Sequence, residues 1–223
     1  MLVTGKCGLV SYGNKTYRFL NQRSREWTHP YEYPPRPGGT LTDSGCGIFS
    51  MCHAVEVMCG KRVSPEELAD FSCREGGRGD DGTNRPQLLR AMREKGLLAG
   101  YGIRYEHTPA PDDEDGHSND HEALWRAIVQ GGCALCNLRP GHIVTLIDAR
   151  GSDGERQLLA MDCHSESGDS RVKDFVREIL PGSEVVSPVL GEGGLVTGYL
   201  VNYGLFWVPL AFPKNFDLLY PVE

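Results

Sequence analysis

The chain lacks the features that would place it in a membrane or on a nucleic acid. Among its 223 residues, no apolar run approaches the roughly 18 needed to cross a bilayer. Lys and Arg are scattered, and a formal net charge of -7 opposes binding to a polyanion such as DNA or RNA. We therefore expect no membrane insertion and no nucleic-acid partner, and the expected partner is a protein, a peptide or a small molecule.

No secretory signal is visible either, because the first residues show no basic segment followed by a long apolar one. The 8 cysteines are spread along the chain and do not form the dense framework of a small disulfide-rich domain. Both observations favour a cytoplasmic protein whose cysteines are mostly reduced. Export, with a signal already removed, is the alternative.

Composition and patterning predict one domain over residues 1–223, of the α+β class. Hydrophobic residues make up 39% and charged residues 24%, as is ordinary for a globular protein, and no repeat is visible. A hairpin is expected over residues 1–20 and an acidic loop insertion over residues 105–120. Helices are expected at 46–59, 64–71, 85–96 and 121–132, and strands at 99–106, 133–138, 142–150, 157–162 and 195–212. N-terminal helices would thus pack against a C-terminal antiparallel sheet.

Cys46 lies between two glycines, where a polar turn gives way to a helix. Ile48, Met51 and Val55 share one face of that helix, and Gly60 provides its end. A thiol at the helix start faces the first-turn N–H groups and the positive end of the helix dipole, which favour a thiolate. A helix end supplies only about 1 kcal/mol, whereas lowering a thiol pKa from about 8.5 to about 4 takes roughly 6 kcal/mol. An imidazolium is therefore required nearby.

Of the 7 histidines, His142 is the best placed to be that imidazolium. It follows a Pro-Gly turn and begins the predicted strand HIVTLIDA, which is a rigid position for a general base. His53 lies on the same helix as Cys46 but about 10 Å along its axis. Asp162 ends the next predicted strand, so an antiparallel pairing would bring its carboxylate beside His142 and orient the ring.

An oxyanion hole would complete this arrangement. It needs the backbone N–H of Cys46 and one side-chain amide. Gln22, upstream of the nucleophile in the segment LNQRSREW, is the candidate for the amide, and Asn21 is the competing choice.

The segments DSGCGIFS, VSPEELADF and GHIVTLIDA, followed by a Met-Asp pair, resemble the C39-like branch of the papain-like cysteine peptidases. The resemblance implies a papain-like fold with the nucleophile at the start of a central helix. It implies that Cys46 is the nucleophile, His142 the general base and acid, Asp162 the orienting residue and Gln22 the oxyanion donor. It further implies a hydrolase that cleaves an amide bond of a peptide or protein through an acyl-enzyme, without cofactor or metal.

Other hypotheses remain open beside this one. The same triad also supports acyl transfer or deamidation, and a catalytically silent papain-like module would bind a peptide in the cleft. A third hypothesis is a metal-binding or structural protein that uses Cys133, Cys136 and Cys163. Core packing is the simpler expectation for Cys133 and Cys136, since residues three apart on a strand point to opposite faces.

Two loops have simpler interpretations than the motifs that they resemble. The acidic loop nearly matches a calcium-binding pattern but has Pro111 at the first ligand position, so we expect a solvated loop at a cleft rim that selects basic substrates. The triplet Arg78-Gly79-Asp80 is expected to be a solvated turn.

Overall fold

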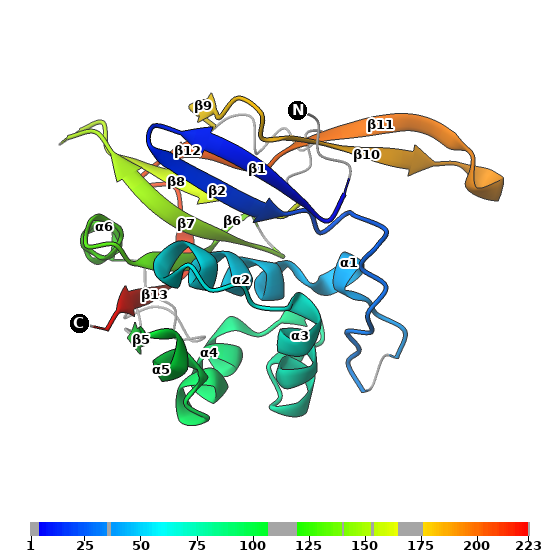
Figure 1. Cartoon of the computed structure of the whole chain (residues 1–223), viewed down its shortest axis with the longest axis horizontal. Coiled ribbons are helices and arrows are strands. Elements are labelled where there is room, and N and C mark those ends of the chain that lie inside the picture. Colours follow the sequence, from blue (N-terminus) through cyan, green and yellow to red (C-terminus); the bar gives the residue numbers. More distant parts are fainter. Residues whose placement is uncertain are drawn as a thin grey trace.

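The computed structural model describes residues 5–34, 37–106, 120–139, 141–152, 154–164 and 176–222. Six α-helices lie within these ranges (Figure 1): α1 (Leu41–Ser44), α2 (Cys46–Cys59), α3 (Pro65–Arg74), α4 (Arg85–Glu94), α5 (Leu97–Tyr101) and α6 (His121–Val129). The predicted acidic loop and most of its calcium-like pattern fall on residues 107–119, which lie outside the described ranges.

The central sheet has seven strands in the order β5-β13-β6-β7-β8-β12-β9, and each neighbouring pair is antiparallel. These strands are β5 (Ile103–Glu106), β6 (Cys133–Arg139), β7 (His142–Arg150), β8 (Gln157–Met161), β9 (Glu178–Ile179), β12 (Leu205–Pro209) and β13 (Lys214–Pro221). The combination of α-helices with a mainly C-terminal antiparallel sheet confirms the α+β class at this level.

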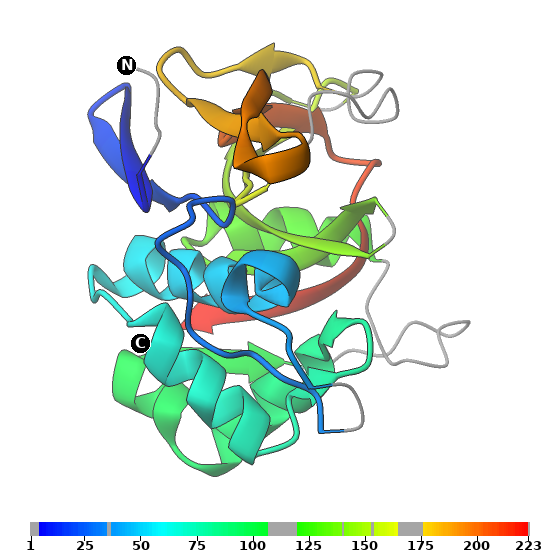
Figure 2. The same cartoon turned by 90° about the vertical axis from the view of Figure 1, so that its right-hand side faces the viewer.

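Three two-stranded ribbons accompany the sheet. They are β1 (Cys7–Tyr12) with β2 (Lys15–Leu20), β3 (Arg78–Gly79) with β4 (Gly82–Thr83), and β10 (Glu184–Leu190) with β11 (Val196–Tyr203). The first ribbon is the predicted N-terminal hairpin, and it turns at Gly13 with a φ of 59°. The β10–β11 ribbon extends away from the rest of the chain (Figures 1 and 2).

Alternate residues of the sheet strands belong to two separate cores. On β7, Ile143 and Ile147 join the core that contains α2, whereas Val144 and Leu146 join the core that contains α6. This period of two is the normal consequence of strand geometry when both faces of a sheet are covered. The sheet is therefore buried on both faces, with α2 on one of them.

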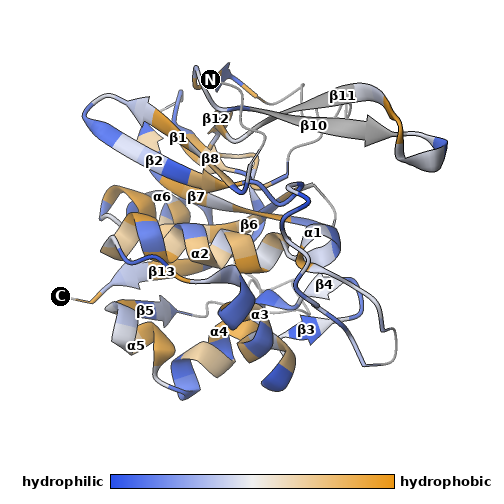
Figure 3. Cartoon of the chain, turned by 45° about the vertical axis from the view of Figure 1, so that its right-hand side comes forward, coloured by the Kyte–Doolittle hydropathy of each residue, from blue (hydrophilic) through white to orange (hydrophobic). Residues whose placement is uncertain are grey.

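Helix α2 is the central helix of the structure and lies between the sheet and helices α3 to α5 (Figure 1). Each of its first ten residues is buried, so it has no solvated face over that length. Most of its ribbon has apolar colours in Figure 3. The helix ends at Gly60, as predicted, because that residue adopts the left-handed conformation with a φ of 67°.

Several predicted elements differ from the structure. Residues 99–106 were expected to form one strand, but α5 occupies the first part, and Gly102, with a φ of 73°, ends that helix before β5 begins. The predicted strand 195–212 is divided at Gly204 into β11 and β12, which belong to different sheets. A side chain at Gly204 would meet the Phe19 ring at 2.6 Å, which explains why a glycine is needed there. Strand β13 was not predicted, although it lies inside the central sheet.

The triplet Arg78-Gly79-Asp80 is the expected solvated turn only at its last residue, which is exposed. It begins the β3–β4 hairpin, and the Arg78 side chain is buried. The guanidinium donates hydrogen bonds to the carbonyl oxygens of Tyr31 and Gly82 and lies over the Tyr31 ring. Arg78 thus fixes this hairpin to the preceding loop.

Candidate active site

Cys46 is the first residue of α2, and its sulfur receives backbone hydrogen bonds. The N-cap is Gly45, which has no side chain to occupy the free N–H groups of the first helical turn. The N–H of Gly47 and the N–H of Ile143 on β7 both interact with the Cys46 sulfur. Both donors favour a thiolate over a thiol.

The two glycines beside Cys46 are required by close packing. A Cβ atom at Gly45 would lie 2.5 Å from the carbonyl oxygen of Leu41, and one at Gly47 would lie 2.5 Å from the Thr83 Cβ atom. Gly45 has an ordinary φ of -86°, so backbone freedom is not the reason for a glycine there. The Gly-Cys-Gly motif therefore lets α1 and the β3–β4 hairpin approach Cys46 closely.

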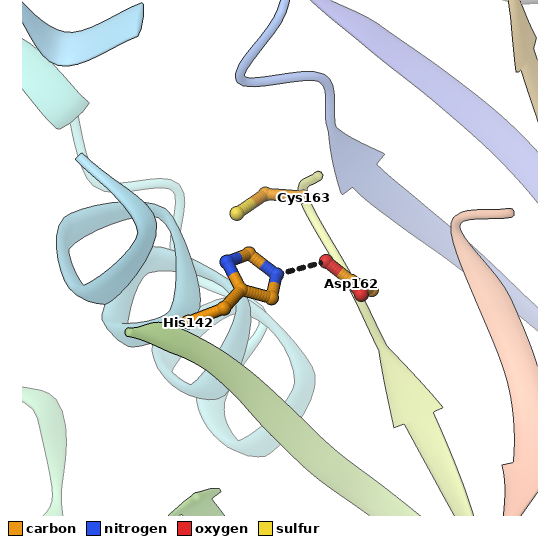
Figure 4. A group of neighbouring side chains, drawn as sticks. All are labelled: His142, Asp162 and Cys163. Atoms are coloured by element: carbon orange, nitrogen blue, oxygen red, sulfur yellow. Dashed lines mark hydrogen bonds and ion pairs between the residues drawn. The ribbon is translucent and has the colours of Figure 1, made fainter. Parts of the chain in front are cut away.

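His142 and Asp162 form a buried pair. The Nε2 atom of His142 lies 2.6 Å from Oδ1 of Asp162, and both residues are 4% exposed (Figure 4). The pairing of β7 with β8 produces this contact, as the sequence predicted. With Nε2 engaged by Asp162, Nδ1 is the ring nitrogen left for the hydrogen bond between His142 and Cys46.

The pKa values of the three side chains shift in directions that favour an ion pair. Burial raises the pKa of Cys46, but the hydrogen bond and charge of His142 and the two N–H groups lower it, with a net decrease. Burial lowers the pKa of His142, whereas Asp162 and Cys46 raise it, to about 9. Burial raises the pKa of Asp162, yet His142 and the N–H of His164 lower it overall. Both shifts move the pair toward a thiolate beside an imidazolium.

Two buried hydrogen bonds join α2 to β7 and so hold Cys46 relative to His142. The Ser50 hydroxyl, one turn after Cys46, donates to the carbonyl oxygen of Ile143 at 2.9 Å. The Thr145 hydroxyl donates to the carbonyl oxygen of Ser50 at 2.8 Å. Both hydroxyl residues are fully buried, so these bonds do not compete with water.

The side chain of Gln22 lies in the site, whereas that of Asn21 is occupied elsewhere. The Nε2 atom of Gln22 donates to the carbonyl oxygen of Thr42, in α1, at 3.0 Å. Its Oε1 atom accepts from the sulfur of Cys163 at 3.2 Å. Asn21 bonds to the carbonyl of Gly5 and to the N–H of Arg23, which stabilises the turn after β2. The contacts therefore place the amide of Gln22, and not that of Asn21, beside Cys163.

Cys163 and His164 belong to the site but were not predicted to do so. The Cys163 sulfur lies 3.9 Å from the carbonyl oxygen of Cys46. The N–H of His164 donates to Asp162 at 2.7 Å, and its ring meets the His142 ring edge to face, with centroids 5.6 Å apart. Their adjacency to Asp162 was the available signal, but a strand end carries no periodicity that indicates which side chains turn inward.

A cleft of about 560 Å³ opens beside Cys46. Cys46, Gly141 and Ile143 line one part of it, and Asn137 lies nearby on β6. The rest is formed by Arg90 and by residues 79–87, from the β3–β4 hairpin and the start of α4. Cys46 is therefore buried at 8% exposure yet reaches a space large enough for a short peptide segment.

The cysteine set proposed for a metal is separated in the structure. Cys133 packs into the α2 core and Cys136 into the α6 core, on opposite faces of β6, so the hypothesis that they share a metal with Cys163 is wrong. In the described part of the chain, His142, Asp162 and Cys163 form the one group with metal-ligating atoms within 4.8 Å of one another. The separation of 2.6 Å between His142 and Asp162 fits a hydrogen bond, whereas two ligands of one zinc ion would lie about 3.3 Å apart.

Comparisons with protein-family models and with curated proteins found no match. Among the helices of the described ranges, none is both long and apolar enough to span a membrane.

Proposed function

We propose that the protein is a papain-like cysteine peptidase of the C39-like type, which hydrolyses an amide bond of a peptide or protein. The observation that carries this proposal is the buried series from Cys46 through His142 to Asp162, with opposite pKa shifts of the thiol and the imidazole. The position of Cys46 at the start of a central helix packed on an antiparallel sheet supports the papain-like assignment.

In the proposed reaction, the Cys46 thiolate attacks the carbonyl carbon of the scissile amide. The resulting oxyanion is stabilised by the N–H of Cys46 and the second N–H of the Gln22 amide. His142 then gives its proton to the leaving amine, which leaves an acyl group on Cys46. A water molecule, deprotonated by His142, releases that acyl group, while Asp162 holds the ring in one orientation throughout.

Acyl transfer and side-chain deamidation use the same residues and differ in the acceptor or in the amide attacked. The silent binding module differs more, because it requires no reactive thiolate. The lowered pKa of Cys46 favours an active enzyme over that module.

A peptide library incubated with the wild-type protein and with Cys46→Ala distinguishes these functions by mass spectrometry. New amino termini that depend on Cys46 support a peptidase. Mass increases of about 1 Da without chain cleavage would identify a deamidase, and adducts with an added amine would identify a transferase. Products that are the same for both proteins would contradict thiol catalysis.

A further inference from the structure

The Gln22 amide can assist catalysis in only one of its two orientations. Its NH₂ group, and not its carbonyl oxygen, must face the oxyanion, because the oxyanion needs a hydrogen-bond donor. The two ends of an amide have nearly the same shape, so packing alone does not select between them. Neighbouring hydrogen-bonding groups must make the selection.

Two neighbours of Gln22 make that selection in the structure. The carbonyl oxygen of Thr42 accepts from Nε2, and the sulfur of Cys163 donates to Oε1 at 3.2 Å. Turning the amide over would place Oε1 against the Thr42 oxygen, and these two acceptors would repel each other. It would also leave NH₂ facing the sulfur, which is a weak acceptor.

Cys163 is held in place for this contact. Its backbone oxygen accepts the N–H of Gln22 at 2.9 Å, so the two residues are fixed by their main chains as well as by their side chains. The side chain is buried at 4% exposure, and Figure 4 shows the sulfur beside the His142 ring, on the side away from Asp162. The oxygens of Gln22 and Cys46 near the sulfur are both acceptors, and the single S–H hydrogen is donated to the nearer one, Oε1 of Gln22 at 3.2 Å rather than the Cys46 oxygen at 3.9 Å.

We propose that Cys163 is a positioning residue whose S–H group fixes the Gln22 amide with its NH₂ directed to the oxyanion. This inference rests on the proposed function. It assigns to Cys163 a role in the step that forms the tetrahedral intermediate and none in the formation of the thiolate.

Two reactions of Cys46 separate these roles. Acetylation by p-nitrophenyl acetate transfers the acetyl group to the Cys46 sulfur, releases p-nitrophenolate, and passes through an oxyanion. Alkylation by iodoacetamide displaces iodide without an oxyanion. Both rates at Cys46 can be followed by peptide mass spectrometry, which distinguishes this thiol from the other cysteines and requires no knowledge of the natural substrate.

The substitution Cys163→Val keeps the approximate shape of the side chain but removes the donor, whereas Cys163→Ser keeps a donor. We expect Cys163→Val to slow acetylation by about tenfold, a fraction of the 10²- to 10³-fold cost of losing an oxyanion donor. Alkylation at pH 6 should stay unchanged, and Cys163→Ser should retain most of the acetylation rate. In a Gln22→Ala background, Cys163→Val should cause no further loss.

The inference is overturned if Cys163→Val leaves acetylation unchanged, or if it lowers acetylation equally in the presence and absence of Gln22. Should Cys163→Val not fold, Cys163→Ala removes the same donor with a smaller side chain and is held to the same expectation. Slow alkylation of Cys46 in the wild-type protein would instead defeat the proposed function, and this inference with it. Fast alkylation without an effect of Cys163 would defeat this inference alone.

Discussion

At the scale of single residues, the chemistry depends on one proton shared between Cys46 and His142. Burial alone would keep both groups neutral, because it raises the pKa of the thiol and lowers that of the imidazole. The hydrogen bond and charge of His142, with the N–H groups at the sulfur, lower the pKa of Cys46, and Asp162 together with Cys46 raises the pKa of His142. The two groups therefore titrate as a coupled pair, in which Asp162 causes the larger part of the rise at His142.

This coupling predicts different pH profiles for two reactions of the same thiol. Amide cleavage needs the imidazolium as an acid, so its rate should fall as pH rises through about 9, the raised pKa of His142. Alkylation needs only the thiolate and should stay high above that pH. Rates of both reactions measured from pH 5 to pH 10 provide the test, and parallel decreases above pH 9 would contradict it.

The same pKa shift makes a contribution to stability with a definite sign. Since the folded pKa of His142 lies above its ordinary value of 6.5, its contribution is complete below about pH 6.5 and is lost as pH rises through about 9. Asp162→Asn removes the carboxylate that causes most of the rise, so the slope of unfolding free energy between these pH values should diminish. Urea unfolding of both proteins at pH 6.5 and pH 9 measures this change, and equal slopes would contradict the role assigned to Asp162.

The positions of Cys46, His142 and Asp162 could be predicted from the sequence because each is recognisable: a helix start, a strand start and a strand end. Cys163 and His164 could not, because they follow the end of β8. Their inward direction depends on contacts with Gln22 and Asp162. The contact of Cys163 with Gln22 joins residues that are distant in sequence, so it leaves no local pattern.

At the scale of elements, the Gly-Cys-Gly motif joins α2 to its neighbours. Gly47→Ala would place a Cβ atom 2.5 Å from Thr83 on β4, and we expect a loss of about 1–3 kcal/mol of stability from overpacking. Gly100→Ala, in α5, is the matched control, because nothing lies within 4 Å of its Cβ position. Urea unfolding should show a large difference between the two variants. Equal stabilities would contradict the close approach of the β3–β4 hairpin.

The hydroxyl bonds between α2 and β7 have a separate test. Ser50→Ala should cost about 1–3 kcal/mol and also slow the alkylation of Cys46, because the helix start is then held less firmly against β7. Ser183→Ala removes a similar buried bond, to the carbonyl of Leu205, and should affect stability without affecting alkylation. Identical effects of both substitutions on alkylation would show that the α2–β7 bonds have no special role.

Elements with regular apolar spacing, such as α2, α6, β7 and β8, could be predicted from the sequence. Short elements, and elements that follow one another without a change in apolar pattern, could not be predicted. Helix α5 has five residues and shares its apolar character with β5, and Gly102 alone marks the boundary between them. Strand β13 is recognisable mainly by its partners β5 and β6, which are far away in the sequence.

At the scale of the whole molecule, the eight cysteines occupy distinct environments. None of them is in a disulfide. Burial raises the pKa of Cys52, Cys133 and Cys136, in the last case to about 12, so these thiols should not react in the folded protein. Cys7 and Cys73 are exposed and provide internal references for accessible thiols. The fold therefore lowers the pKa of Cys46 and raises the pKa values of Cys52, Cys133 and Cys136.

The central claim is that Cys46 is a thiolate paired with a protonated His142. Its most direct test is the rate of iodoacetamide alkylation at each cysteine from pH 5 to pH 9, in the wild-type protein and in His142→Ala. At about pH 6, we expect Cys46 to react at least roughly tenfold faster than Cys7 or Cys73, and His142→Ala to abolish that advantage. A Cys46 rate that rises only near pH 8.5 and is unaffected by His142→Ala would contradict the ion pair and the enzyme proposed from it.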